Sequence, residues 1–491
     1  MPLRFSNTDD IRGLREALVA TSYNAARMNE YIDWRLGSTS PFNSAPSLLY
    51  SMRGDSKLRA ITALFLLQMP VSERQAADAL EPAGIAELID AGLLRRENDS
   101  IYAQFRIIPS LNTFVVCDLK LFGRHPAQDY VLGTSISSAT LMAATIRKPS
   151  RRTLDLCAGS GIQALAAATH SGTVIAAEKN VRAIRLGEFS AILNGVSNVE
   201  FRESDFYSAV EGERFDLIVA NPPYVISPER EFQFRDGGMG ADRVGEHIIR
   251  NAPRFLEEGG YCQMLCDWAN YKGTSFEQRL SSWAAGAGCD MAVIRSESTR
   301  MHIYPLGWLA DIYANEPVEY QSKYQKWVDY FEHEGIESMT FGMIALRRRA
   351  AARNWFHVTG DALDIGKITG SEVERIFAAK DFLEANASND ALLSCRLHLN
   401  KDVRLDQRLL QDEEAWSLRE CILAMSDSRR PPVPTDPYMG GVCARLRGER
   451  PLREIVAEMA VAIRADPERL AEQVVPVIRG LIERGFVEGK V

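Results

Sequence analysis

The spacing of hydrophobic and polar residues divides the chain into three segments. Apolar residues recur mostly at helical spacing over residues 1–120. Over residues 121–350, short apolar runs alternate with helical patterns, which is typical of a parallel sheet with helices on both faces. Helical spacing prevails again over residues 351–491. The pattern therefore predicts an α/β domain between two mainly helical domains.

In the first segment, a compact pattern follows the helices. Ser72 is placed to cap a short helix, a second short helix covers Ala83–Ala91, and Tyr102–Pro109 reads as strand. This order predicts a winged helix-turn-helix. Its second helix carries Glu87 and Asp90 but no Lys or Arg, so packing or protein contacts are favoured over the reading of duplex DNA. The earlier helices are expected over Ile11–Thr21, Asn24–Leu36 and Lys57–Leu67.

The central segment begins its alternation at Thr153. Met339–Arg347 is expected to be its last strand. The other expected elements are strands at Thr153–Leu156, Thr173–Ala177, Val199–Arg202 and Phe215–Ala220, and helices at Gly161–Thr169 and Val181–Asn194.

The third segment contains a proline-rich break at Arg430–Pro437. After it, helical patterns at Pro451–Ala460 and Asp466–Arg484 precede a glycine-bounded strand at Gly485–Gly489. This repeats the rhythm of the first segment and predicts a second winged helix.

Composition narrows the class of protein. With 46% hydrophobic and 25% charged residues among 491, the chain has ordinary globular usage, which excludes a mostly disordered protein. The net charge of -8 argues against a general DNA binder. Apolar stretches are too short for membrane insertion, and no secretory signal is evident, so a cytoplasmic protein with its eight cysteines as reduced core thiols is expected.

Candidate chemistry starts at the first central strand. Asp155 lies in this strand, and Gly159 and Gly161 form a turn into the following helix, so the backbone can approach a ligand closely. The second strand ends in Glu178, where a carboxylate could accept hydrogen bonds from a ribose diol. After the third strand, Asp205-Phe206 offers an acid and an aromatic ring for an adenine.

The fourth strand ends in Asn221-Pro222-Pro223-Tyr224. With the glycine turn and the two acids, this motif resembles the class I S-adenosylmethionine-dependent methyltransferases of the Asn-Pro-Pro-Tyr branch. Leu154–Gly161, Asn221–Val225 and Ile249–Leu256 look most like the protein glutamine N-methyltransferases that act on release factors and ribosomal proteins. The resemblance covers roughly Tyr130–Trp268, a little over a quarter of the chain.

The resemblance implies a fold, a cofactor and a site. The fold is a Rossmann-like class I methyltransferase core with a seven-stranded, mostly parallel sheet, here flanked by mainly helical, winged-helix-like domains. The cofactor is S-adenosyl-L-methionine, and the catalytic residues are Asn221, Pro222, Pro223 and Tyr224. The expected cofactor-binding residues are Asp155, Cys157, Ala158, Gly159, Gly161, Glu178, Lys179, Asp205, Phe206 and Asn221.

The tetrad also suits methyl transfer to nitrogen on chemical grounds. The sulfonium donor is already activated, so the enzyme must mainly position a nitrogen lone pair for in-line attack. The side-chain oxygen of Asn221 and the carbonyl of Pro222 can accept both N–H groups of a planar amine or amide. Tyr224 offers a flat face for stacking, and the prolines stiffen the loop.

Other stretches leave alternatives open. Tyr130–Thr140 replaces the family's charged segment with small polar residues, which puts a glutamine acceptor in doubt. Phe234–Asp242 is either a mobile lid or a connection, and Arg347–Arg353 is either an RNA contact or, more in keeping with its place, a solvated exit from a strand. His247 and His302 are not required by the mechanism.

The leading hypothesis is an N-methyltransferase that acts on a protein or peptide side chain or on a small molecule. In a second hypothesis, the acceptor is an exocyclic amine of a nucleobase in RNA or DNA. In a third, the chain is a winged-helix regulator that senses the cofactor. No membrane partner or metal is expected.

Overall fold

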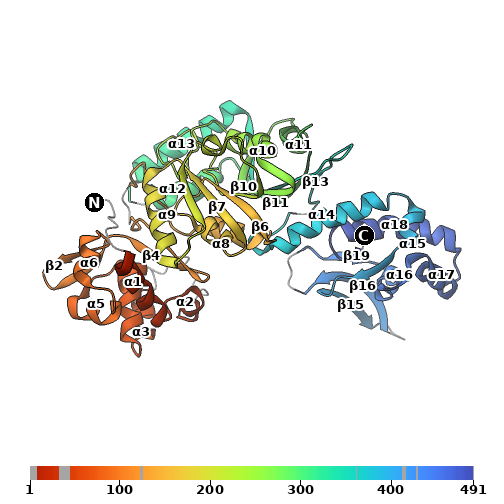
Figure 1. Cartoon of the computed structure of the whole chain (residues 1–491). Helices are drawn as coiled ribbons and strands as arrows, with labels where there is room; N and C mark the ends of the chain where they lie inside the picture. Colours follow the sequence, from red (N-terminus) through yellow and green to blue (C-terminus); the bar gives the residue numbers. More distant parts are fainter. Residues whose placement is uncertain are drawn as a thin grey trace. The chain divides into compact units, whose positions relative to one another are not determined.

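The computed structural model describes residues 8–31, 45–121, 125–313, 315–360, 362–411, 416–426 and 430–489. These residues form two compact units (Figure 1). The first comprises residues 1–142, 147–291 and 298–355, and the second comprises 143–146, 292–297 and 356–491. The first two predicted domains thus fall in one unit, and the three-domain division stays a prediction.

The N-terminal part of the first unit contains the predicted order of two short helices and a β-hairpin. Ser72 caps α5, and Gln75 completes a capping box with it. The apolar face of α9 contributes to the same core as these N-terminal helices, which explains why no boundary separates them. The winged-helix assignment stays a prediction. The helices are α1 (Thr8–Ala20), α2 (Ala25–Tyr31), α3 (Ala45–Ser51), α4 (Ser56–Ile61), a π-helical turn (Thr62–Leu66), α5 (Glu73–Leu80) and α6 (Ile85–Asp90). The strands are β1 (Val71–Ser72), β2 (Leu94–Glu97), β3 (Ser100–Ala103), β4 (Arg106–Ser110) and β5 (Thr113–Cys117).

The predicted helix over Asn24–Leu36 is present up to Tyr31, and its remainder lies outside the described residues.

The central sheet has the order β13-β11-β12-β10-β9-β6-β7-β8. Strands β8, β7, β6, β9 and β10 pair in parallel, and β12 pairs antiparallel with β10. The bounds are β6 (Ser150–Leu156), β7 (Ser171–Glu178), β8 (Val199–Glu203), β9 (Phe215–Ala220), β10 (Leu256–Tyr271), β11 (Cys289–Arg300), β12 (Ile336–Arg348) and β13 (Phe356–Val358). The expected mostly parallel α/β sheet is confirmed, but the short strand β13 makes it eight-stranded instead of seven-stranded.

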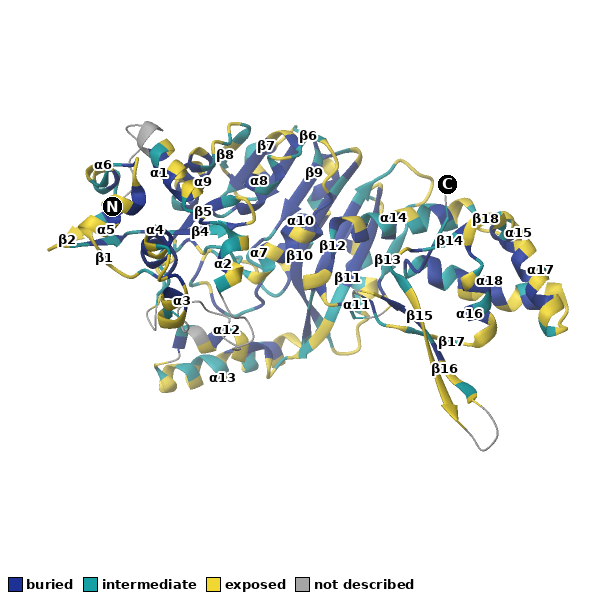
Figure 2. Cartoon of the chain, turned by 90° about the horizontal axis from the view of Figure 1, so that it is seen from below, coloured by how far each residue is buried: buried dark blue, intermediate teal, exposed yellow. Residues whose placement is uncertain are grey.

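Helices cover both faces of this sheet. The parallel register places Met264 of β10 and Phe201 of β8 on opposite faces. Gly245 of α10 faces Met264, whereas Gly187 of α9 faces Phe201, so the two helices pack on opposite sides. Figure 2 shows the buried strands between their helices. The helices are α7 (Ile136–Ala144), α8 (Ile162–Ala167), α9 (Val181–Asn194), the 3-10 turn Ser208–Val210, α10 (Arg243–Phe255), α11 (Phe276–Trp283), α12 (Tyr304–Tyr313) and α13 (Pro317–Glu334).

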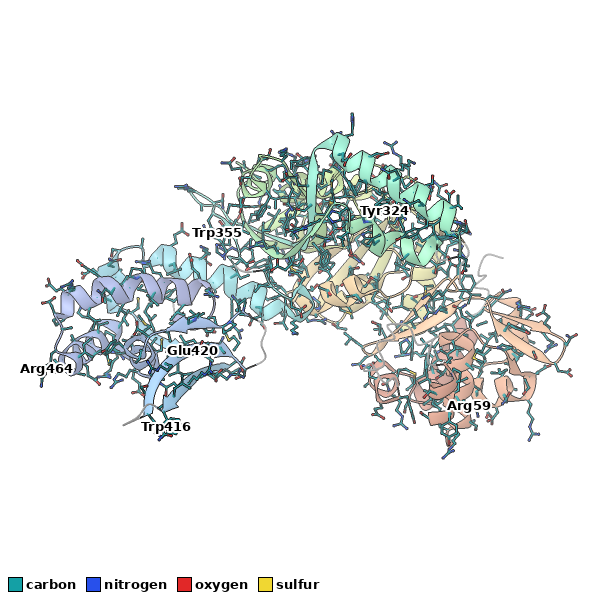
Figure 3. The ribbon with its side chains drawn as sticks, turned by 180° about the vertical axis from the view of Figure 1, so that it is seen from behind. Arg59, Tyr324, Trp355, Trp416, Glu420 and Arg464 are labelled. Atoms are coloured by element: carbon teal, nitrogen blue, oxygen red, sulfur yellow. The ribbon has the colours of Figure 1, made fainter. Side chains whose placement is uncertain are left out.

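The second unit has a core of its own. The prediction of a mainly helical segment overlooked its two sheets: the long β15–β16 hairpin is mostly exposed and carries no alternating pattern, and the proline-rich break contains β17. The exposed Trp416 lies at the start of β16 (Figure 3). The elements are the 3-10 turn Ile365–Lys367, α14 (Gly370–Ala385), α15 (Asn389–Ser394), β14 (Arg396–Leu399), β15 (Val403–Gln411), β16 (Trp416–Met425), β17 (Val433–Thr435), α16 (Pro437–Ala444), β18 (Arg447–Pro451), α17 (Leu452–Ile463), α18 (Pro467–Glu483) and β19 (Val487–Gly489).

Two smaller expectations are decided by the structure. All eight cysteines are free, and six of them are buried, as the prediction of reduced core thiols requires. The basic run is not simply a solvated exit, because Arg347 and Arg349 form ion pairs with the buried Asp290. No helix in the part of the chain that the structure describes has the length and apolar content for crossing a membrane.

Candidate active site

One cavity of about 1140 Å³ opens at the carboxyl ends of the parallel strands, where ligands bind in open α/β sheets. It is lined by the ends of β6, β7, β9 and β10 and by the loops that follow the first three. The lining includes every residue predicted for catalysis and every residue predicted for the cofactor except Gly161. Single-ligand pockets span roughly 300 to 1000 Å³, so this cavity has room for a donor and an acceptor group.

The glycine turn between β6 and α8 shapes the cofactor end. Gly159 has a φ of +55° and faces open space, so a side chain at this position would be strained and would project into the cavity. Gly161, with φ of +81°, faces the ring of Phe201 and serves the packing of α8. Cys157 also has a positive φ, of 60°. The turn therefore leaves bare backbone beside the cavity.

Glu178 is held in place by this turn. One carboxylate oxygen accepts a hydrogen bond from the Gly159 N–H at 2.7 Å, and the other accepts from the Asn180 N–H at 2.8 Å. Burial raises the pKa of Glu178. A carboxylate has about four lone-pair positions, so each oxygen keeps capacity for one hydroxyl of a diol.

Asp155 acts locally as well. It lies at the end of β6, is 1% exposed, and its Oδ2 accepts a hydrogen bond from the Ala164 N–H at 2.8 Å. Burial raises the pKa of Asp155 to about 7. Its position under the glycine turn links β6 to α8.

The expected adenine end is more open. Lys179 and Asp205 form an exposed ion pair with an Nζ–Oδ1 distance of 3.1 Å, and exposed pairs of this kind contribute little stability. The Phe206 ring lies 4.9 Å from the His247 ring, measured between centroids. His247 and His302 do not line the cavity.

The acceptor end is built around the tetrad that follows β9. Asn221 Oδ1 is buried and has no hydrogen-bond partner among the described residues, whereas its Nδ2 lies 3.5 Å from Ser137 Oγ. The Tyr224 ring lies 5.7 Å from that of Phe341 and 6.4 Å from that of Trp308, between centroids. Burial raises the pKa of Tyr224, so its hydroxyl stays protonated.

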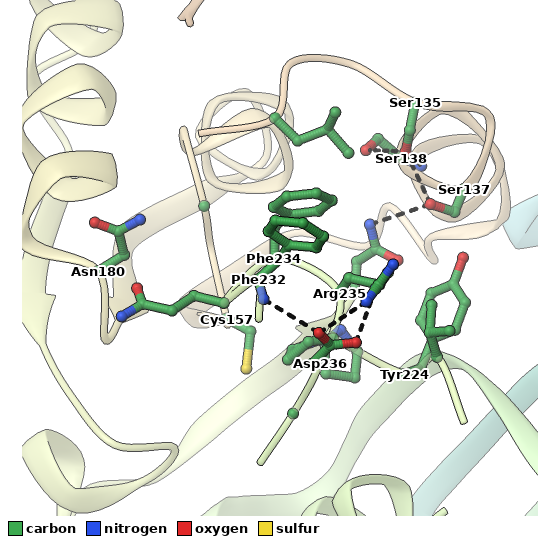
Figure 4. A pocket seen from close by; sticks show the side chains of 18 of the residues that line it. Ser135, Ser137, Ser138, Cys157, Asn180, Tyr224, Phe232, Phe234, Arg235 and Asp236 are labelled. Carbon is green, nitrogen blue, oxygen red and sulfur yellow. Dashed lines mark hydrogen bonds and ion pairs between the residues drawn. The ribbon is translucent and has the colours of Figure 1, made fainter. Parts of the chain in front are cut away.

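The segment after the tetrad is well packed. Arg235 and Asp236 form a buried ion pair, and Asp236 also accepts hydrogen bonds from the Glu231 and Phe232 N–H groups. Phe232 and Phe234 stack with centroids 5.7 Å apart (Figure 4). Of the two alternatives for Phe234–Asp242, these contacts favour a fixed wall of the cavity over a mobile lid.

Tyr304 joins the tetrad's loop to the sheet. Its hydroxyl donates a hydrogen bond to Asp267 Oδ2 of β10 and accepts one from the Ile226 N–H at 3.2 Å. Burial raises the pKa of Asp267 to about 7. The sequence analysis missed Asp267, Tyr304, Trp308 and Phe341. Only Asp267, an acid inside an apolar run, carried a signal.

The site fits S-adenosylmethionine on three observations: the bare glycine turn, the oriented Glu178 carboxylate and the unpartnered Asn221 oxygen. Within the described ranges, no group of three or more His, Cys, Asp or Glu side chains is placed to hold a metal ion.

Comparison with known proteins agrees with this reading. Residues 134–280 match the family model of the methyltransferase small domain. Residues 43–104 and 374–489 match domains of unknown function, DUF7059 and DUF7782 respectively. A predicted protein N5-glutamine methyltransferase of Methanocaldococcus jannaschii is 30% identical over 148 residues, which are 28% of this chain and 70% of that protein. The chain therefore belongs to the methyltransferase small domain family, whose cofactor is S-adenosylmethionine.

Within that family, the similarity is to glutamine methyltransferases. A release factor glutamine methyltransferase of Xylella fastidiosa is 36% identical over 131 residues, or 24% of this chain and 47% of that protein. A ribosomal protein uL3 glutamine methyltransferase of Xanthomonas campestris is 33% identical over 129 residues, or 24% and 41%. The chain thus spans about half the length of these two relatives.

Solved structures with distant similarity include the YcgJ protein of Bacillus subtilis. It shows 13% identity and a TM-score of 0.31, covering 44% of this chain and 100% of that one. A methyltransferase from Pyrococcus furiosus shows 13% identity and a TM-score of 0.29, covering 48% and 90%. Because both scores are low, the fold assignment rests on the strand order of the sheet.

Proposed function

We propose that this chain is an N-methyltransferase that transfers the methyl group of S-adenosylmethionine to the amide nitrogen of a protein side chain. The observation that carries the proposal is the buried, unpartnered Asn221 Oδ1 in the wall of the cavity. A buried acceptor without a donor costs roughly 1 to 3 kcal/mol, so its retention needs a compensating role. An incoming N–H group supplies the missing donor.

The chain's residues orient the acceptor. The bound cofactor supplies an activated methyl group. Asn221 Oδ1 and the Pro222 carbonyl accept the two N–H groups of a planar –NH₂, which turns its lone pair out of conjugation. Tyr224 provides the stacking face. Its ring is itself steadied by Trp308 and Phe341.

The proposal needs no dedicated base. An amide nitrogen becomes strongly acidic once it has gained the methyl group, so its proton leaves to water after transfer. The chain then has to supply position, and two walls do so: the tetrad loop is tied to β10 through Tyr304, and Asp236 holds the next segment.

Several observations favour a protein acceptor over a nucleobase. The named activity of the relatives is glutamine methylation. In the cavity lining, Lys179 and Arg235 are each paired with a carboxylate, so few cations remain for phosphates. Free thiols fit a reducing compartment, and we place the reaction in the cytoplasm.

The test is incubation of the full chain with methyl-labelled cofactor and separate pools of proteome, total RNA and metabolites. Label is expected in protein, recovered as N-methylated amide after proteolysis, and absent with the Asn221→Ala variant. Label confined to RNA or to metabolites would sink the proposal.

A further inference from the structure

The mouth of the cavity carries an exposed apolar rim, defined here by Leu132, Ile136, Ile303 and Leu306. These side chains are 44%, 80%, 47% and 39% exposed, respectively, yet all four line the cavity. Single exposed apolar residues are common on protein surfaces. Four around one opening are a feature of interaction sites.

The rim surrounds the acceptor end. Ile136 begins α7 and directly precedes Ser137, which contacts the side chain of Asn221. On another side, Leu306 belongs to α12, whose Trp308 lies against the Tyr224 ring. An acceptor that reaches Asn221 must therefore pass these apolar side chains.

The charges near the opening restrict what can lie on the rim. Lys179 and Arg235 are paired with Asp205 and Asp236, respectively. Among the described residues that line the cavity, Arg230 is the only further Lys or Arg. A nucleic acid strand would find little to neutralise its phosphates there, whereas apolar side chains of a polypeptide would exclude water from the rim.

We propose that the rim binds apolar residues adjacent to the methylated amide in a polypeptide acceptor. The proposal rests on the function proposed above and adds a sequence preference to it: apolar flanks on either side of the acceptor residue. The rim, not the tetrad, would then select among the many amides of a proteome.

Two labelled peptides test this preference. Fluorescein-labelled Gly-Leu-Gln-Leu-Gly and Gly-Ser-Gln-Ser-Gly are titrated with the full chain saturated with S-adenosylhomocysteine, and fluorescence anisotropy gives each Kd. We expect the leucine peptide to bind at least about tenfold more tightly, because two side chains lose apolar surface to water. Ile136→Ser and Leu306→Ser should each reduce this ratio.

Val318→Ser is the matched control. Val318 is 85% exposed on α13 and does not line the cavity, so its substitution should leave both affinities unchanged. Equal affinity for the two peptides, or no binding of either, would overturn the rim proposal. So would a dimer that dissociates on Ile136→Ser in sedimentation velocity, because a second copy would then cover the rim.

The same mixtures with labelled S-adenosylmethionine separate the two proposals. Preferential binding of the leucine peptide without methyl transfer would contradict the proposed function and leave the rim intact. Transfer to both peptides at equal rates and affinities would support the function and contradict the rim.

Discussion

Removal of the Asn221 side chain is the most direct test of the nitrogen-positioning mechanism. In the structure, Asn221 contributes little to folding: its Oδ1 has no partner among the described residues, and its one printed contact, to Ser137 Oγ, is long at 3.5 Å. A contact at that distance is worth under about 1 kcal/mol, so Asn221→Ala should unfold close to the wild-type temperature.

The expected kinetic loss is much larger. Losing one preorganised polar contact to a reacting group costs about 10²- to 10³-fold in turnover, equivalent to roughly 2.7 to 4 kcal/mol. The assay is single-turnover methyl transfer at saturating cofactor, with calorimetric titration of S-adenosylhomocysteine on the same protein. The turnover rate should fall by at least ~10²-fold, while the cofactor Kd changes by less than about threefold.

Asn251→Ala serves as the control with the same chemical change. Asn251 lies on α10 outside the cavity lining, where its side chain donates to the His247 carbonyl at 2.8 Å. It should retain wild-type turnover. An Asn221→Ala enzyme with near wild-type turnover would refute the mechanism. Equal losses in turnover and in cofactor affinity would instead assign Asn221 to the cofactor alone.

Three further predictions concern the cofactor end, the stacking face and pH. Glu178→Ala should weaken cofactor binding by roughly 1 to 3 kcal/mol in calorimetry, since the diol loses its acceptor; unchanged affinity in a folded variant would contradict this placement. Tyr224→Phe should keep most activity and Tyr224→Ala should lose it, because the ring face is what stacks; an inactive Tyr224→Phe enzyme would show that the hydroxyl participates. Asp155 has a pKa near 7 when folded and 3.8 as the reference, so the folded state binds the proton more tightly and stability falls as pH rises from about 4 to 7. Asp155→Asn should remove up to about 1.4 kcal/mol per pH unit of this slope in urea unfolding, and an unchanged slope would refute the assignment.

Local features of the site were accessible from sequence. The helix Val181–Asn194 and the strand Phe215–Ala220 were predicted with the ends that the structure shows. A capping Asn180 and a left-handed Gly195 bound that helix, and such signals act within a few residues. The glycine turn and the tetrad follow buried strands, so their meeting at one edge of a parallel sheet was also predictable.

Elements without a strong local pattern were missed. Strand β13 has three residues, too few for an alternating pattern, and it turned a seven-stranded prediction into an eight-stranded sheet. Strand β15 is exposed along almost all of its length, so no buried face sets a period of two. Pairing across a hairpin, not local hydrophobicity, makes β15 a strand.

The sequence by itself determined the class of cofactor site, because turn geometry, capping and strand periodicity depend on neighbouring residues. The tertiary structure alone decided how the acceptor end is closed. Ser137, Tyr304 and Trp308 lie some eighty residues from the tetrad in the chain, and only packing between α7, α12 and the sheet brings them to Asn221 and Tyr224. Contacts at that separation are selected by the shape and burial of the whole unit, which no local pattern records.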